Sequence, residues 1–190
     1  MVTFLKKFFK KVKVLLKKLM KAVACFNHQI SGYVLFEMVG KDKDTVCKVT
    51  IKLENFEPCK THAIHIHEYG DMRQGCKSAG GHYNPFNKNH GCIHLSDKNR
   101  HVGDLINNIT SDENGKVNEV YYDNLIKVYS KNNFIIGRSV VIHDGIDDLG
   151  LGGLSNTGQV INEKVHEESL KNGNAGCRID CAIIGICKDD

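Results

Sequence analysis

The chain's histidines are concentrated in one short stretch, and this stretch limits what the chain can fold into. Seven of the ten histidines lie within residues 62–104. His65 and His67 form an H-x-H pair, and His101 and Asp104 form an H-x-x-D pair. Residues i and i+2 of a strand point to the same face, so one strand can direct the imidazoles of His65 and His67 at a single ion. The pattern indicates a metal site supported by β-strands.

The segment between the two pairs has the composition of a loop. Residues 75–91, GCKSAGGHYNPFNKNHG, are rich in Gly and Asn and contain a Pro. Such a loop can bring His82 and His90 back toward the strand ends. A lone histidine is more often an ordinary exposed or hydrogen-bonded side chain than a ligand. This number of histidines at these spacings favours metal binding.

Outside this loop the sequence has the short β-prone runs of an all-β protein. Polar or glycine-containing turns separate the runs. A long glycine-rich loop is predicted at residues 144–176. Eight short strands, little helix and two long loops predict an antiparallel sandwich or barrel. The runs are Val23–Phe26, Ile30–Val39, Val46–Leu53, Ala63–His67, His101–Ile109, Val117–Tyr122, Ile135–His143 and Arg178–Ile186.

The first 24 residues have a different pattern, that of a basic amphipathic helix. Eight of the 26 basic side chains are lysines of residues 1–25, which contain no acid, so 18 basic and 22 acidic side chains remain in the rest of the chain. On a helix these lysines lie opposite one apolar face. We therefore divide the chain into an N-terminal arm, residues 1–20, and a domain, residues 21–190. The apolar face contains Leu5, Phe8, Phe9, Val12, Leu15, Leu16 and Leu19.

Such an arm favours contact with an anionic membrane or another polyanion. Packing of its apolar face on the domain or on a partner is the alternative. A mitochondrial transit peptide is also amphipathic and free of acids, but it is rich in arginine, which the arm lacks. The sequence contains no run of about 18 apolar residues, so a transmembrane helix is not predicted. Sequence-specific binding to nucleic acid is not expected either. The cytoplasm is the expected location, with membrane-surface association, an organelle or a virion as alternatives.

Five motifs resemble those of the copper/zinc superoxide dismutases. In chain order they are HIHEYGD, GCKSAGGHYNP, HVGDL, GRSVVIHDGIDDLGLGG and GNAGCRIDCAIIGI. The likeness covers roughly residues 21–187. It implies an eight-stranded antiparallel Greek-key sandwich or barrel of the immunoglobulin-like kind. It also implies dismutation of superoxide to dioxygen and hydrogen peroxide.

The resemblance implies the ligands of one copper and one zinc per subunit. Four imidazoles suit Cu(II), whereas three imidazoles and one carboxylate suit tetrahedral zinc. His82 belongs to both sets and would bridge the two metals. The implied copper ligands are His65, His67, His82 and His143, and the implied zinc ligands are His82, His90, His101 and Asp104.

The family's reaction implies roles for further residues. Superoxide reduces Cu(II) and leaves as dioxygen, and a second superoxide reoxidises copper and leaves as peroxide. The bridging histidine, here His82, takes up a proton when its bond to copper breaks. Arg178 matches the arginine that holds the anion at the mouth of the copper site. Asp147 matches the aspartate that accepts hydrogen bonds from His65 and His90 and orients both rings.

The resemblance also implies a disulfide between Cys76 and Cys181. This bond would tie the metal loop to the last strand and so position Arg178. Disulfides are rare in the cytosol, but the family retains this one there. The chain has eight cysteines and no C-x-x-C, so a cysteine zinc site is not expected, and most of the other thiols are expected to be buried.

Two surface features follow from the same resemblance. Glu167, Glu168 and Lys171 match charges that guide superoxide toward the copper, with ordinary surface charge as the alternative. An apolar contact between two copies would make a homodimer, although alternation alone would place some of its residues in the core. The matching contact residues are Tyr69, Gly70, Ile135, Ile136, Gly137 and Ile184–Ile186.

The sequence departs from the family pattern at the arm and at two further places. The segment before His101 is longer than expected and supplies His94 as a competitor of His90 for zinc. An insertion at Leu154–His166 could narrow the channel, slow superoxide or add a binding surface. The alternative functions are storage or delivery of copper without catalysis, and a surface-bound protein that acts through its arm. The presence of every implied ligand and of Arg178 favours the enzyme.

Overall fold

The computed structural model describes residues 21–40, 45–96, 99–129 and 133–188. These residues form an all-β domain with one α-helix, which confirms the predicted fold class. The N-terminal arm lies outside the described residues, so its helix stays a prediction. Within the described part of the chain, no helix combines the length and the hydropathy needed to cross a membrane.

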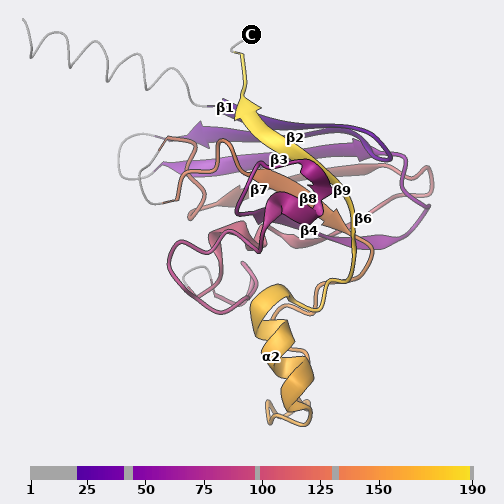
Figure 1. Cartoon of the computed structure of the whole chain (residues 1–190), viewed down its shortest axis with the longest axis vertical. Helices are drawn as coiled ribbons and strands as arrows, with labels where there is room; N and C mark the ends of the chain where they lie inside the picture. The colour runs from indigo at the N-terminus through magenta and orange to yellow at the C-terminus, as the bar shows by residue number, and fades with distance from the viewer. Residues whose placement is uncertain (1–20, 41–44, 97–98, 130–132, 189–190) are drawn as a thin grey trace, which may run out of the picture.

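Eight antiparallel strands form a nearly closed barrel (Figure 1). Their order is β6-β4-β8-β9-β1-β2-β3-β7, so β6 and β7 lie at the two ends of the sheet. A short additional strand, β5 (Arg73–Cys76), lies outside this order. The eight strands are β1 (Lys21–Asn27), β2 (Ser31–Val39), β3 (Val46–Glu54), β4 (Thr61–His67), β6 (Asn107–Thr110), β7 (Val117–Asp123), β8 (Ser139–His143) and β9 (Arg178–Ile186).

The barrel core follows the period of two that the sequence shows in its first strands. Ala22, Ala24 and Phe26 of β1 are buried, while the side chains between them are more exposed. In β3 the buried side chains include Ile51 and Leu53. Burial of large apolar side chains is worth about 1.5–3 kcal/mol each relative to exposure, so this inner face accounts for the register of the strands.

Strand β4 is buried on both faces, and this places the histidine pair. Ile64 and Ile66 belong to the apolar core, whereas His65 and His67 point to the opposite side of the strand. Both histidines are nevertheless buried, because the loops after β4 and β8 cover that side. The H-x-H pair therefore lies on a rigid central strand, and loop residues cover it.

The predicted strand at residues 101–109 is wrong in its first half. A 3-10 helix, η3 (Val102–Asp104), occupies this part, and β6 begins only at Asn107. The Asp104 carboxylate accepts a hydrogen bond from the backbone N–H of His101, which closes a tight turn in place of a strand. The turn directs His101 and Asp104 to the same place.

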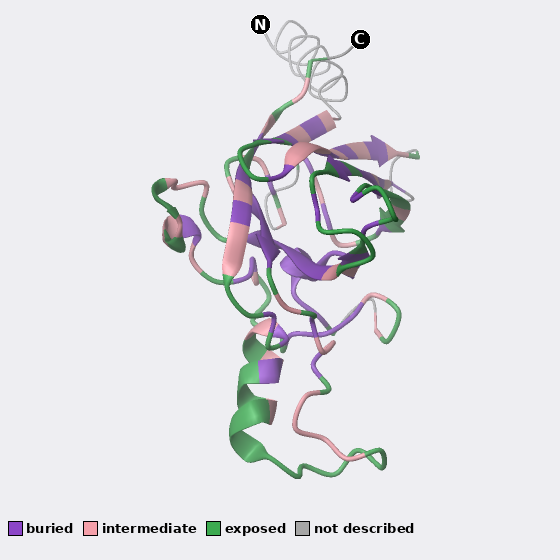
Figure 2. Ribbon diagram, turned by 90° about the vertical axis from the view of Figure 1, so that its right-hand side faces the viewer, coloured by how far each residue is buried: buried purple, intermediate pink, exposed green. Residues whose placement is uncertain are grey.

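The predicted loop at residues 144–176 contains an α-helix that periodicity did not reveal. Helix α2 (Glu163–Asn172) begins after Asn162, whose side chain accepts a hydrogen bond from the Val165 N–H, and ends at Gly173 in the left-handed conformation. The helix projects from one end of the barrel, and most of its surface is exposed (Figures 1 and 2). Only Ser169 is buried, so a stripe of core residues is missing from its sequence.

Candidate metal centre

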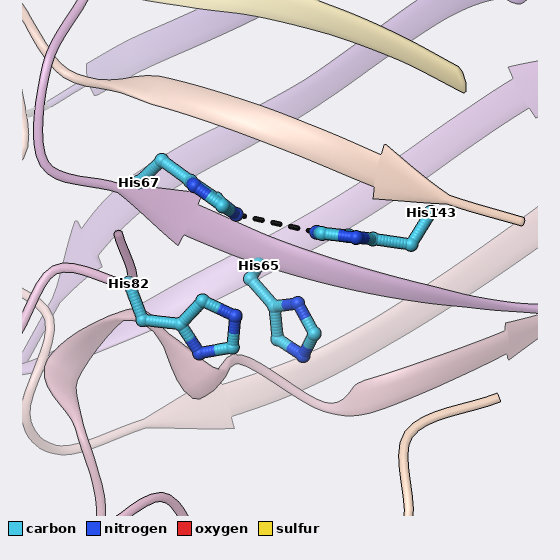
Figure 3. A group of neighbouring side chains, drawn as sticks. All are labelled: His65, His67, His82 and His143. Atoms are coloured by element: carbon cyan, nitrogen blue, oxygen red, sulfur yellow. Dashed lines mark hydrogen bonds between the residues drawn. The ribbon is translucent and has the colours of Figure 1, made fainter. Parts of the chain in front are cut away.

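Two neighbouring strands supply three of the histidines that converge on the outer side of the barrel wall. His65 and His67 come from β4, and His143 is the last residue of the adjacent strand β8. The β8–β9 register shifts between Ile142 and His143, which marks a local irregularity at that strand end. The Nε2 atoms of His67 and His143 lie 3.2 Å apart (Figure 3).

His82 comes from the loop and completes this first cluster. Its backbone forms an isolated bridge with His67, and its ring centroid lies 4.0 Å from that of His65. One ring nitrogen from each of four buried residues lies within 4.8 Å of the others. The first cluster consists of His65, His67, His82 and His143.

A second cluster surrounds one oxygen of Asp104. The Nδ1 atoms of His82, His90 and His101 lie 3.2, 2.9 and 3.0 Å from Asp104 Oδ1. The other oxygen, Oδ2, accepts hydrogen bonds from the backbone N–H groups of Gly91 and His101. The carboxylate is therefore fixed in orientation, with one oxygen directed at three imidazoles.

Most of these rings have one nitrogen anchored to the protein and the other directed into a cluster. His65 Nε2 pairs with Asp147 Oδ2 at 2.5 Å, His67 Nδ1 with the Gly80 carbonyl at 2.9 Å, and His143 Nδ1 with the Gly176 carbonyl at 3.2 Å. An acceptor at one nitrogen places the proton there and leaves a lone pair on the other. With these protons on Nδ1, His67 and His143 direct two lone pairs toward each other over 3.2 Å, an arrangement that a cation bound by both nitrogens would stabilise.

Three buried ring nitrogens of the clusters have no hydrogen-bond partner among the described residues: His65 Nδ1, His82 Nε2 and His101 Nδ1. His101 Nδ1 is close to Asp104 Oδ1 but lacks hydrogen-bond geometry, whereas its Nε2 is anchored to the Lys88 carbonyl at 2.9 Å. A buried polar atom without a partner costs about 1–3 kcal/mol. Metal ligation satisfies all three atoms, so the residues present fit two metal ions.

Burial keeps the rings of the first cluster neutral, as ligation requires. Burial lowers the pKa of His65 to about 4, against the raising effect of Asp147. Burial also lowers the pKa of His67 and His82 well below the ordinary value, and neighbouring imidazoles add to the shift. The pKa of His143 is lowered by burial as well. Four neutral donors can therefore face one ion near neutral pH.

The second cluster has the opposite electrostatic character. Burial opposes the charge of His90, but hydrogen bonds with Asp104 and Asp147 outweigh it and raise the His90 pKa to about 10. Burial likewise opposes ionisation of Asp104, yet the imidazoles of His101, His82 and His90 beside its carboxylate hold the Asp104 pKa well below the ordinary value. Two buried carboxylates beside His90 thus favour a positive charge at this place.

Asp147 connects the clusters, as its match to the family's aspartate implied. Its two oxygens accept hydrogen bonds from His65 Nε2 and His90 Nε2, one residue of each cluster. Burial opposes its ionisation, but these two hydrogen bonds outweigh burial and lower the pKa of Asp147. Two further hydrogen bonds fix the carboxylate, from Asn107 Nδ2 to Oδ2 over 3.1 Å and from the Leu149 N–H to Oδ1 over 2.6 Å.

Arg178 lies at the mouth of a pocket that opens onto the first cluster. The pocket has a volume of about 520 Å³ and is lined by His67, His82 and His143 among others. Arg178 donates from Nη1 to the Cys76 carbonyl at 2.6 Å and from Nη2 to the Gly80 carbonyl. Burial lowers the pKa of Arg178 from its very high ordinary value. The guanidinium is therefore a fixed cation beside the histidines.

The disulfide implied by the resemblance is present. Cys76 and Cys181 are joined across 105 residues of sequence, with their Cα atoms 5.7 Å apart. Cys76 also accepts the hydrogen bond from Arg178, so the disulfide and the guanidinium fix the same segment. The remaining thiols are mixed in exposure: Cys47 and Cys92 are buried, Cys187 is intermediate, and Cys25, Cys59 and Cys177 are exposed. The expectation that most are buried is wrong.

The predicted guiding charges divide between the pocket and the open surface. Glu168 and Lys171 line the pocket, with Lys171 Nζ 3.7 Å from Glu168 Oε2, whereas Glu167 is exposed on α2 outside the lining. The Leu154–His166 insertion, all of which is described, contributes no lining residue. His166 Nδ1 pairs with the Gly152 carbonyl at 2.9 Å and lies outside both clusters.

The structure decides between two histidines and adds two supporting residues that the sequence did not reveal. His94 is exposed and outside the second cluster, while His90 is buried within it. His62 is buried with Nδ1 2.8 Å from the His143 carbonyl, and Asn107 bonds Asp147. Because His62 lies in the histidine-rich stretch, the sequence offered a weak indication that it belongs near the centre. Nothing in the sequence indicated a role for Asn107.

A β-barrel that carries two adjacent clusters of potential metal ligands, with one imidazole shared between them, has the architecture of a binuclear metalloprotein. The copper/zinc superoxide dismutase family model matches residues 30–184, and this match covers most of the domain. The chain belongs to the copper/zinc superoxide dismutase family, which is a family of enzymes.

Individual relatives agree with this assignment. The chain is 41% identical over 173 residues to the Cu-Zn superoxide dismutase of Paramecium bursaria Chlorella virus 1, covering 91% of this chain and 82% of the relative. It is 43% identical over 157 residues to that of Saccharomyces cerevisiae, covering 83% and 90%. The crystal structure of the clock protein EA4 is similar at a TM-score of 0.74 and 36% identity, covering 88% and 95%.

Proposed function

We propose that the chain dismutates superoxide with copper held by the first cluster and zinc held by the second. The observation that carries this proposal is the position of His82. Its Nδ1 faces Asp104 in the second cluster, and its buried Nε2 faces the first cluster without a hydrogen-bond partner. A single imidazole so placed can bridge two metals.

The donor atoms support the assignment of each metal. Four imidazole nitrogens from His65, His67, His82 and His143 suit Cu(II). Three imidazoles and the carboxylate of Asp104 suit zinc, which prefers four ligands in structural sites. When bound, copper supplies a one-electron couple that alternates between reduction and oxidation by superoxide.

The chain's own residues bind superoxide and supply a proton for the formation of hydrogen peroxide. Arg178 presents a permanent positive charge at the pocket that His67, His82 and His143 line, and this charge attracts the anion. Backbone carbonyls of Cys76 and Gly80 hold the guanidinium in place. His82 Nε2 is the atom that we propose to hold and release a proton, because Asp104 maintains the orientation of the ring through Nδ1.

Superoxide consumption by the purified protein, with metal content measured on the same sample, tests the proposal. We expect rapid consumption from samples that contain one copper and one zinc per chain. Protein that binds both metals without consuming superoxide would contradict dismutation and favour copper storage or delivery. Zinc bound at the first cluster in preference to copper would contradict the assignment of the metals.

A further inference from the structure

The three imidazoles of the second cluster differ in what holds the ring nitrogen that faces away from Asp104. The Nε2 atom of His82 faces the first cluster, and that of His90 is held by the buried carboxylate of Asp147. His101 Nε2 instead donates to the backbone carbonyl of Lys88 over 2.9 Å. Among the three rings, His101 alone is therefore anchored to the protein backbone.

This anchor lies in an exposed part of the chain. Residues 85–89 are all exposed, whereas His101 and Asp104 are buried. Asn87 has a positive φ of 49°, so the segment turns sharply instead of continuing as a strand. An exposed turn can change its backbone conformation at little cost in buried surface. The Lys88 carbonyl therefore needs a further contact to hold the His101 ring in a constant orientation.

The side chain of Asn84 supplies this contact. Its Nδ2 donates to the Lys88 carbonyl over 2.7 Å, and its Oδ1 accepts a hydrogen bond from the Lys88 N–H over 2.9 Å. One carboxamide thus binds both polar groups of the Lys88 backbone. The carbonyl accepts two hydrogen bonds, from Asn84 Nδ2 and from His101 Nε2, which matches its two lone pairs.

Asn84 is fixed in turn by the backbone of its neighbour. The Tyr83 N–H donates to the Ile66 carbonyl of β4 over 2.8 Å, and the Tyr83 carbonyl accepts from the Gly103 N–H of η3 over 3.0 Å. Strand β4 carries the H-x-H pair, and η3 ends at Asp104. The carboxamide of Asn84 therefore reaches the turn from a backbone position that is tied to both clusters.

We propose that Asn84 is a positioning residue for the second metal site and acts on the His101 ring through the Lys88 carbonyl. The carboxamide fixes the carbonyl, the carbonyl keeps a proton on His101 Nε2, and the lone pair of Nδ1 stays directed into the cluster. His101 Nδ1 lies 3.0 Å from Asp104 Oδ1 and has no hydrogen-bond partner among the described residues. The inference rests on the proposed assignment of zinc to this cluster.

Two substitutions separate the two halves of the Asn84 carboxamide. Asn84→Asp keeps an oxygen for the Lys88 N–H but loses the donor to the Lys88 carbonyl, whereas Asn84→Ala loses both. Zinc affinity of the full-length protein is measured by competition with a chelator. We expect both variants to bind zinc about tenfold or more weakly than the wild type. Wild-type affinity in Asn84→Asp would overturn the proposal, because closure of the turn alone would then suffice.

Asn87→Asp is the matched control for the added charge. Asn87 lies in the same turn and borders the same surface pocket as Asn84, and aspartate tolerates a positive φ as asparagine does. We expect this variant to bind zinc as tightly as the wild type. Equal weakening in Asn87→Asp and Asn84→Asp would assign the loss to charge and overturn the proposal.

Proton exchange separates the orientation of one ring from general loosening of the site. In the copper- and zinc-loaded protein after reduction, both metal ions are diamagnetic, so nuclear magnetic resonance can detect the Nε2–H protons of His101 and His90. We expect the His101 proton to exchange with solvent faster in Asn84→Asp than in the wild type. The His90 proton should be unchanged, because Asp147 holds it.

Equal acceleration of exchange at both rings would indicate damage to the whole site and overturn a specific action on His101. Zinc binding that neither Asn84 variant weakens would contradict this inference alone. Wild-type protein that binds no zinc would contradict the proposed function together with the inference.

Discussion

Each ring nitrogen of His82 faces a different cluster, and the neighbouring rings are held by acceptors such as Asp147 and the Gly80 and Gly176 carbonyls. The ligand atoms are therefore selected before any metal binds. Asp147 extends this selection to both clusters because His65 and His90 each donate to one of its oxygens. Single-residue changes at the centre should consequently affect metal binding more than folding.

Replacing one ligand of the first cluster tests its role directly. We expect His143→Ala to lower superoxide consumption to background while the protein stays folded, because its core neighbour Ile142 is unchanged. Activity and copper content are measured together with circular dichroism. His94→Ala is the control, since His94 is exposed and outside both clusters. Full activity of the His143 variant with one copper per chain would contradict the ligand assignment.

Reversal of the charge at the pocket mouth tests electrostatic attraction. We expect Arg178→Glu to lower activity about tenfold or more at low ionic strength, where the Debye length is about 30 Å at 0.01 M. The loss should become smaller as salt is added, because screening removes the long-range part. Activity is measured over a salt series.

Arg73→Glu is the matched control for this experiment. Arg73 undergoes the same change of charge, but its side chain is 87% exposed and pairs with Asp71 outside the pocket. An equal effect of both variants would assign the loss to net charge. A loss at Arg178 that does not vary with salt would indicate local damage instead.

At the scale of elements, helix α2 contacts the metal centre through the residue that ends it. Gly173 adopts φ 67° and lies against the hydrogen bond between Asp147 and His90. A Cβ atom at this position would lie 2.5 Å from Asp147 Oδ1 and 2.6 Å from His90 Nε2. The end of the helix is thus as closely packed as the cluster itself.

We expect Gly173→Ala to weaken zinc binding by about tenfold to a hundredfold, because it displaces the carboxylate that orients His90. Zinc affinity is measured by competition with a chelator. Gly158→Ala is the matched control, since Gly158 also has a positive φ of 78° but nothing within 4 Å of an added Cβ. Equal weakening in both variants would attribute the effect to backbone strain alone.

At the scale of the whole molecule, the predicted dimer contact is only partly available. Ile135 and Ile184 are fully buried in the core of their own chain, so they are not contact residues, which corrects the resemblance on this point. Tyr69 and Ile186 are exposed by 51% and 62%, and Ile183, which was not predicted, is exposed by 48%. Alternation along β9 accounts for the difference.

We expect a homodimer that uses this exposed apolar face. Ile183→Lys should shift the protein toward the monomer, because a dimer would bury the new charge without a partner. Sedimentation velocity gives the oligomeric state over a range of concentrations. Ile161→Lys is the control, since Ile161 is 71% exposed at the tip of the insertion, away from β9. A wild-type monomer at high concentration would contradict the dimer.

The N-terminal arm, which lies outside the described residues, gives a second prediction at the scale of the whole molecule. We expect full-length protein to bind anionic vesicles and protein without residues 1–20 to lose most of that binding, because seven of the arm's 20 residues are lysines opposite an apolar face. Co-sedimentation with vesicles measures binding, and neutral vesicles are the control. Equal binding of both proteins would contradict a role of the arm at membranes.

Local spacing in the sequence determined most of the strands and the placement of the H-x-H pair. Alternation assigned the inner face of β1 and β3, and H-x-H placed His65 and His67 on one side of β4, because side chains of a strand alternate between faces. The motifs that resemble the copper/zinc superoxide dismutases supplied the remaining ligands, the disulfide and Arg178. These features depend on neighbours in sequence or on short motifs.

Only the tertiary structure decided which ring nitrogen of each histidine faces a metal and which residues hold the other nitrogen. Asn107, His62 and Gly173 support the centre from three segments, and their contacts arise only when β6, β4 and α2 pack together. It also decided that His90 and not His94 joins the second cluster, because the enclosing loop buries one and exposes the other. Distances between residues that are remote in sequence depend on how the whole chain packs. A local sequence pattern holds no information about that packing.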